Sequence, residues 1–177
     1  MRLTAKFQVP NVNFDCFRQA LHEKLSESLT EAAKQWLMAV VPVSTMEGIP
    51  VWSAASRATF SPLASYATYA LALAPAGDAP DRVQLGLENG DATFEADRNT
   101  GIYRFSYSTT LPHLIINEYH NANTFINPVT GAPYFHLKRP GPYHFQEAGE
   151  RAFRQFASTV ELPGWQSIVD TTQLTVG

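Results

Sequence analysis

The chain has 177 residues, of which 45% are hydrophobic, and this size and composition fit one globular domain and exclude a disordered chain. The formal net charge is −3 without a long basic run, so non-specific nucleic-acid binding is not indicated. Charged residues make up only 16%, against about 25% in an average soluble domain. Two interpretations stay open: other subunits cover part of the surface, or uncharged polar residues do. The sequence predicts no membrane-spanning helix, and its single cysteine, Cys16, has no partner for an intrachain disulfide.

The N-terminal part predicts an extended arm followed by a long helix. Residues 1–10 alternate apolar and polar side chains, which is typical of a strand or an arm. An apolar residue then recurs every three or four positions, which predicts a helix over 13–40 that Pro42 ends. At about 1.5 Å per residue this helix would be roughly 40 Å long, enough to brace a sheet or project toward a neighbour. Its charged face, which includes His22, is expected to be solvated. The expected buried stripe consists of Phe14, Phe17, Leu21, Leu25, Leu29, Ala32, Trp36 and Ala39.

The segment 42–81 is rich in proline and small residues and gives a weaker signal. A strand and a short helix both remain open for residues 51–60. Helix-forming residues favour a short helix within 63–74, and residues 75–81 are typical of a surface loop.

Residues 82–120 predict an antiparallel meander. Apolar and polar residues alternate over 82–88, and the Asn-Gly pair at 89–90 is typical of a hairpin turn. A second turn is expected at 98–101, between two more alternating segments. The stretch "HLIINEYH" at 113–120 is expected to follow as another strand.

The remaining residues predict a loop, a helix and a tail. Residues 121–142 form a long loop with several Gly and Pro residues, and 143–160 carry apolar residues at helical spacing. Gly149 inside this helix should cost about 1 kcal/mol. An extended tail covers 161–177. The fold class expected for the single domain 1–177 is therefore α+β: an antiparallel meander packed by a long N-terminal and a C-terminal helix, with extended arms at both ends.

Candidate chemistry centres on the histidines and on one aromatic stripe. In a regular strand Glu118 and His120 would leave the same face and His113 the opposite face, so the three would not converge on a metal. One alternative function is a small metal-dependent or ligand-binding protein that uses Glu118, His120 and His136. A second alternative is a binding module whose aromatic pocket consists of Tyr103, Phe105 and Tyr107, although such a stripe is also typical of a core. The histidines are His22, His113, His120, His136 and His144.

Three stretches carry a family resemblance. They are "VPVSTMEG" at 41–48, "TTLPHLIINEYHNAN" at 109–123 and "GPYHFQEAGERAFRQF" at 141–156. Together with the order of the predicted elements, they resemble the tail-completion and neck proteins of tailed bacteriophages, the minor tail proteins that join head and tail. The chain departs from the family pattern at His113 and Leu114, where the family has Tyr-Ala.

The resemblance implies a structural virion protein without enzymatic activity, cofactor or metal. Copies of the chain would form a ring, most simply a hexamer, that contacts the connector or stopper and the tail-tube proteins. No membrane or specific nucleic-acid partner is implied, and the protein would be assembled in the host cytoplasm and reside in the virion neck or tail. The extended ends would be able to add a strand to the sheet of a neighbour. The residues expected at subunit interfaces are Glu118, Tyr119, His120, Tyr134, Phe135 and Trp165.

Overall fold

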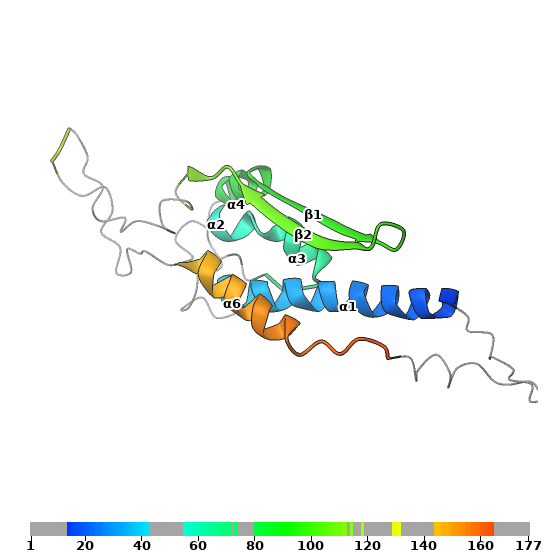
Figure 1. Ribbon diagram of the computed structural model, residues 1–177. Coiled ribbons are helices and arrows are strands. Elements are labelled where there is room, and N and C mark those ends of the chain that lie inside the picture. Colours follow the sequence, from blue (N-terminus) through cyan, green and yellow to red (C-terminus); the bar gives the residue numbers. More distant parts are fainter. Residues whose placement is uncertain are drawn as a thin grey trace, which may run out of the picture.

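The computed structural model has an α+β fold in which one long helix carries a β-hairpin and a second helix (Figure 1). In the view of Figure 1 the hairpin lies above the long helix and the C-terminal helix lies below it. The structure describes residues 14–42, 55–71, 73, 80–112, 114, 118, 129–131 and 144–164. The elements are α1 (Phe14–Val40), α2 (Ala55–Ala58), α3 (Ser61–Tyr66), α4 (Pro80–Glu88), β1 (Gly90–Asp97), β2 (Ile102–Thr109) and α6 (Phe145–Ala157).

The expected fold class is confirmed, as are both amphipathic helices and the turn at 98–101. In that turn the Asp97 carboxylate accepts hydrogen bonds from the Asn99 N–H and the Thr100 hydroxyl, which lower its pKa. The arm 1–10 and most of the loop 121–142 and of the C-terminal tail lie outside the described residues. The open choice for residues 51–60 resolves to helix where the structure describes them, because Ala55–Ala58 form α2.

Burial in α1 is confined to its second half. Leu29, Ala32, Ala33, Leu37 and Val40 are buried, whereas residues of the predicted stripe nearer the start of the helix are less covered. Phe14 is 57% exposed. The predicted buried stripe of α1 is therefore correct in its helical spacing. Its predicted length is wrong, because the described core covers only the C-terminal half of the helix.

The C-terminal end of α1 is held by two side chains from the following segment. Arg57 donates a hydrogen bond from Nη1 to the Pro42 carbonyl oxygen at 2.9 Å, and the Tyr69 hydroxyl donates to the Val41 carbonyl oxygen at 2.8 Å. A cation near the carbonyl end of a helix is electrostatically favourable. Burial lowers the pKa of the Arg57 guanidinium, with an opposing effect from Tyr69.

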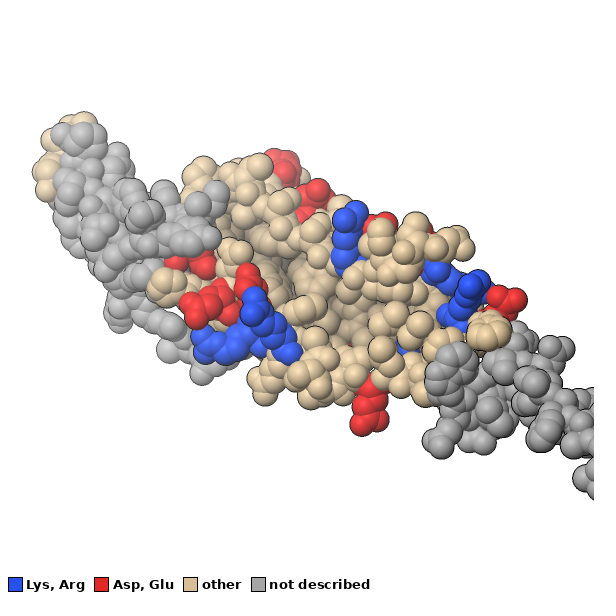
Figure 2. Space-filling view, viewed as in Figure 1, with Lys and Arg blue, Asp and Glu red and all other residues tan. Residues whose placement is uncertain are grey.

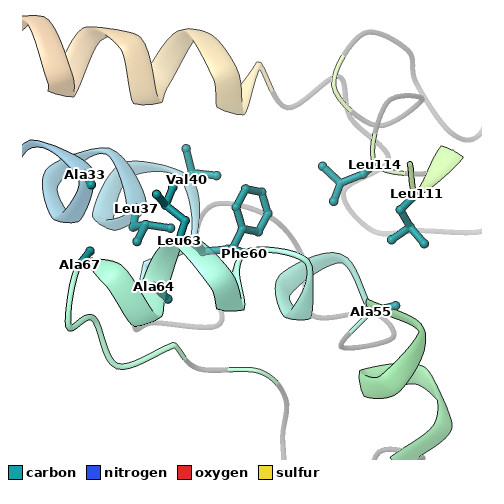
Figure 3. Packing of buried hydrophobic residues seen from close by; sticks show 11 residues of the cluster. Ala33, Leu37, Val40, Ala55, Phe60, Leu63, Ala64, Ala67, Leu111 and Leu114 are labelled. Carbon is teal, nitrogen blue, oxygen red and sulfur yellow. The ribbon is translucent and has the colours of Figure 1, made fainter. Parts of the chain in front are cut away.

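The hydrophobic core lies where α1, α2 and α3 meet (Figure 3). Leu37, Val40 and Leu63 lie together between α1 and α3 in that view. Phe60, which is fully buried, stacks on Tyr107 of β2 with ring centroids 4.4 Å apart. This stack joins the helical core to the sheet.

The strand expected over residues 82–88 is wrong, because these residues belong to helix α4. Pro80 and Asp81 stand in its first turn, where proline and acidic residues are favourable. Gly86 packs against α2 so closely that an added Cβ would lie 2.6 Å from the Cβ of Ala58. The alternation of Val83, Leu85 and Leu87 with polar residues is typical of a strand, but the packing of Gly86 against α2 stabilises the helix instead.

The hairpin turn expected at residues 89–90 is also wrong. Asn89 ends α4, where its side-chain amide donates to the Leu85 carbonyl oxygen, and Gly90 is the first residue of β1. A Cβ on Gly90 would collide with the backbone of Thr59, so the glycine is required for a close approach of two backbones.

The expected meander reduces to the β1–β2 hairpin among the described residues. In the predicted strand 113–120 the described positions, like Pro112 before it, have helical backbone, so the strand is wrong there. The inner face of the hairpin carries Phe94, Phe105 and other aromatic residues that pack on the core. The outer face is polar and pairs Arg104 with Glu95 at 2.7 Å. The aromatic stripe is thus mainly part of the core.

Helix α6 packs closely against α1 at Gly149. This glycine is buried, and a Cβ added to it would lie 2.7 Å from Cε2 of Trp36, well inside van der Waals contact. The same indole lies 5.9 Å from the Phe60 ring and 6.0 Å from the Tyr107 ring. The glycine that is unfavourable for helix propensity is therefore needed for packing.

We expect Gly149→Ala to lower the free energy of unfolding by up to about 2 kcal/mol, because overpacking against Trp36, at about 1–3 kcal/mol, outweighs the gain of about 1 kcal/mol in helix propensity. Urea unfolding measured by circular dichroism checks this. Gly164→Ala is the matched control, since a Cβ there meets nothing within 4 Å. A Gly149→Ala protein as stable as the parent would contradict the close packing.

Candidate functional site

Glu118 holds the start of α6. This residue is only 4% exposed, and its two carboxylate oxygens accept hydrogen bonds from the backbone N–H groups of Phe145 at 2.6 Å and Gln146 at 3.0 Å. The first N–H groups of a helix have no partner within the helix, and a carboxylate also complements the helix dipole. Glu118 therefore supplies the cap that the preceding residue, His144, does not provide with its own side chain.

His144 explains why the cap comes from a distant residue. Its backbone has φ 49° and ψ 38°, in the left-handed region, and its N–H donates to the backbone oxygen of Glu118 at 3.4 Å. A strand prediction would have directed Glu118 outward, toward a neighbouring subunit. In the structure Glu118 instead ties the segment before α6 to the helix within one chain.

Glu118→Gln should lower the free energy of unfolding by about 1–3 kcal/mol, because it removes the charge and one of the two acceptor oxygens from buried N–H groups. Chemical denaturation at pH 7 measures the loss. Glu147→Gln is the control, because Glu147 also lies in the first turn but its side chain is 70% exposed in an ion pair with Arg151. We expect a change within about 0.5 kcal/mol for the control. Equal losses in the two variants would show that only the helix dipole matters.

A groove runs between α6 and the edge of β2 that faces away from β1. It consists of two adjoining hollows of about 440 and 450 Å³, which share Trp36, Phe105 and Glu150 in their walls. We call it the β2–α6 groove. Figure 2 shows that the middle of this face is occupied by side chains without charge, with Lys, Arg, Asp and Glu toward its margins. The residues lining it are Leu29, Trp36, Tyr103, Arg104, Phe105, Ser106, Tyr107, Ser108, Thr109, Leu114, Glu118, Phe145, Gln146, Glu150, Phe153 and Arg154.

A second, more apolar hollow of about 300 Å³ lies next to the groove, between α1 and the end of α6. Leu25 and Leu29 of α1 face Phe156 of α6 across it. Leu162, which follows α6, also lines this hollow and is 56% exposed. The apolar stripe of α1 that the core leaves uncovered thus continues into this surface.

The Tyr107 hydroxyl is the most perturbed acid in the groove. Burial raises its pKa from 10.0 to about 12, while hydrogen bonds with the side chains of Thr59 and Thr109 oppose the shift. Its Oη lies 2.6 Å from Oγ1 of Thr59. This phenol is neutral throughout the physiological range, so its task is to bond the sheet to the core rather than to exchange protons.

Because the pKa of Tyr107 is raised in the folded protein, its contribution to stability is complete below about pH 10 and is lost as the pH rises through 12. We expect the free energy of unfolding to fall more steeply with pH in this window for the parent than for Tyr107→Phe. Urea titrations at pH 9, 10 and 11 check the slope. Tyr66→Phe, at a tyrosine that is 52% exposed, should keep the slope of the parent. If the free energy of unfolding of Tyr107→Phe fell with pH as steeply as that of the parent, the raised pKa of Tyr107 would be contradicted.

The histidines considered as ligands do not form a group among the described residues. His22 was expected on a solvated face, but its Nδ1 lies 2.9 Å from the Tyr103 hydroxyl, so it faces the hairpin. His144 precedes α6, whereas His113, His120 and His136 lie outside the described residues. Within the part of the chain that the structure describes, no three His, Cys, Asp or Glu side chains are grouped to hold a metal.

Of the six residues expected at interfaces, the structure describes Glu118 alone. Tyr119, His120, Tyr134, Phe135 and Trp165 lie outside the described residues, so their interface role stays a prediction. Sequence reasoning did not select Trp36, Gly149 or the edge of β2 as parts of a site. The signal available was a glycine within an otherwise strong helical pattern, which often marks a packing contact.

Comparisons with known proteins give no match: no family model, no curated protein and no solved structure is similar to this chain. None of the described helices combines the length and the hydrophobicity that crossing a membrane requires.

Proposed function

We propose that the protein is a structural subunit that forms a ring at the head–tail joint of a tailed bacteriophage, as a tail-completion, tail-terminator or neck protein. In this role it has no chemistry of its own. Its partners are copies of itself, six in the simplest ring, together with the connector or stopper and the tail tube. Its place is the virion, after assembly in the host cytoplasm.

The observation that carries the proposal is the arrangement of the elements around α1. A long helix ends just before Pro42, a β-hairpin follows, and a C-terminal helix starts at Phe145 and packs back on the first helix. This long helix, hairpin and C-terminal helix are part of the order that the resemblance to neck and tail-completion proteins implies, whereas α2, α3 and α4 before the hairpin and the helical backbone at Leu114 and Glu118 depart from it. The largely apolar groove between β2 and α6 and the exposed start of α1 are surfaces that a neighbouring copy can bury.

A ring places specific demands on the subunit. One surface patch must meet a different patch on the next copy, and the rotation between copies must close. The β2–α6 groove on one face and the start of α1, where Phe14 is 57% exposed, are two such different patches. The alternative of a metal- or ligand-binding protein is less well supported, because both oxygens of Glu118 already bind the start of α6.

Mass photometry of the purified full chain tests the proposal. We expect a discrete oligomer, at about 118 kDa for six chains of 19.6 kDa, that appears as a ring by negative-stain electron microscopy. Because the contacts are mainly uncharged, the oligomer should persist in about 1 M salt, where surface ion pairs are screened. A monomer at all concentrations that is also absent from purified phage particles would overturn the proposal.

A further inference from the structure

The outer edge of β2, which no described strand pairs with, faces the β2–α6 groove. The described sheet has two strands, so β2 pairs with β1 on one side only. The Thr110 N–H donates to the Asn89 carbonyl oxygen, which makes this a hydrogen-bonded pair in the antiparallel ladder. Along an antiparallel ladder, hydrogen-bonded residue pairs alternate with pairs whose backbone groups point away from the partner strand. Thr110, Ser108, Ser106 and Arg104 therefore belong to the hydrogen-bonded set. The N–H and C=O groups of Tyr103, Phe105 and Tyr107 therefore point away from β1, into the groove.

The groove suits an extended polypeptide in both shape and chemistry. A further strand lies about 4.8 Å from its neighbour, and its side chains alternate between the two faces of the sheet. On the inner face it would meet Trp36, Phe105 and Phe153, which line the groove. On the outer face it would continue the polar surface of the hairpin, which carries Arg104 and Ser106. An occupant therefore needs alternating apolar and polar residues.

The N-terminal arm of this chain has that pattern. Residues 2–9, "RLTAKFQV", place Leu3, Ala5, Phe7 and Val9 on one face of a strand and polar residues on the other. The polar set is Arg2, Thr4, Lys6 and Gln8, which suits the exposed outer face of β2.

The place where the chain enters α1 also favours pairing of the arm with another molecule. The described chain begins at Phe14, at the end of α1 that lies beside the tip of the hairpin, where Asp15 and Arg98 are 3.7 Å apart. Thirteen residues precede Phe14 and, at about 3.3 Å each, would span at most roughly 40 Å if fully extended. An arm at one end and a groove on a face are the two different patches of a heterologous contact.

We propose that residues 2–9 of one copy add as a strand to the outer edge of β2 in the neighbouring copy. This inference rests on the proposed ring, because an arm that paired with its own β2 would close each copy on itself. Each copy then gives an arm and receives one, and backbone hydrogen bonds join successive copies around the ring. The polar edge of the sheet, which would otherwise invite uncontrolled pairing, is covered in the assembly.

Disulfide trapping in the full chain tests the proposal. The background is Cys16→Ser with Ser106→Cys, because Ser106 is exposed on the outer face of β2. Thr4→Cys, Lys6→Cys and Gln8→Cys are added one at a time, since their side chains would share that face. Mild oxidation and a non-reducing gel then report the mass of the linked species. The matched controls are Leu3→Cys and Ala5→Cys, whose side chains would point to the opposite face.

We expect at least one even-numbered position to give covalent multimers and the two odd-numbered controls to give at least tenfold less. A disulfide that leaves the mass of a single chain would overturn the proposal, because the arm would then pair with its own sheet. Equal linking at odd and even positions would overturn the strand geometry. If mass photometry finds a ring but no position links, strand addition fails while the proposed ring stands. If all proteins are monomeric, both proposals fail.

Discussion

The structure depends on the packing around the Trp36 indole. This one side chain touches three elements: the Phe60 ring before α3, the Tyr107 ring of β2 and the backbone of α6 at Gly149. Aromatic contacts of this kind add to the area that they bury, and the missing side chain at position 149 lets the helix backbone reach the ring. Together with the edge contact between the Phe105 ring of β2 and the Phe153 ring of α6, it sets the distance between β2 and α6 and therefore the width of the β2–α6 groove.

Two polar anchors complete the frame around this aromatic centre. At one end Arg57 and Tyr69 bind the carbonyl groups of Pro42 and Val41, which directly follow α1, and at the other Glu118 binds the first N–H groups of α6. Each anchor joins segments far apart in the sequence through the unsatisfied backbone of a helix end. The helices are thus fixed both by apolar packing and by their ends, which gives a rigid wall on one side of the groove.

Local patterns in the sequence predicted the elements whose contacts agree with those patterns. The helix over 13–40, the strands around the turn at 98–101 and the C-terminal helix all follow from period and turn residues. Residues 82–88 failed because their strand-like alternation is overruled by the contact of Gly86 with α2. The capping role of Glu118 was not predictable because its partners, the N–H groups of Phe145 and Gln146, are 27 and 28 residues away and leave no local signal. The groove was not predictable for the same reason: its walls meet only after folding.

The central claim is that this chain is built to be covered by copies of itself along the β2–α6 groove. Electron cryomicroscopy of the assembled protein tests it most directly. The account predicts a closed ring in which each groove contains an extended segment of the adjacent copy, hydrogen-bonded along β2. A ring whose copies meet through other surfaces while the groove stays open to solvent would contradict it.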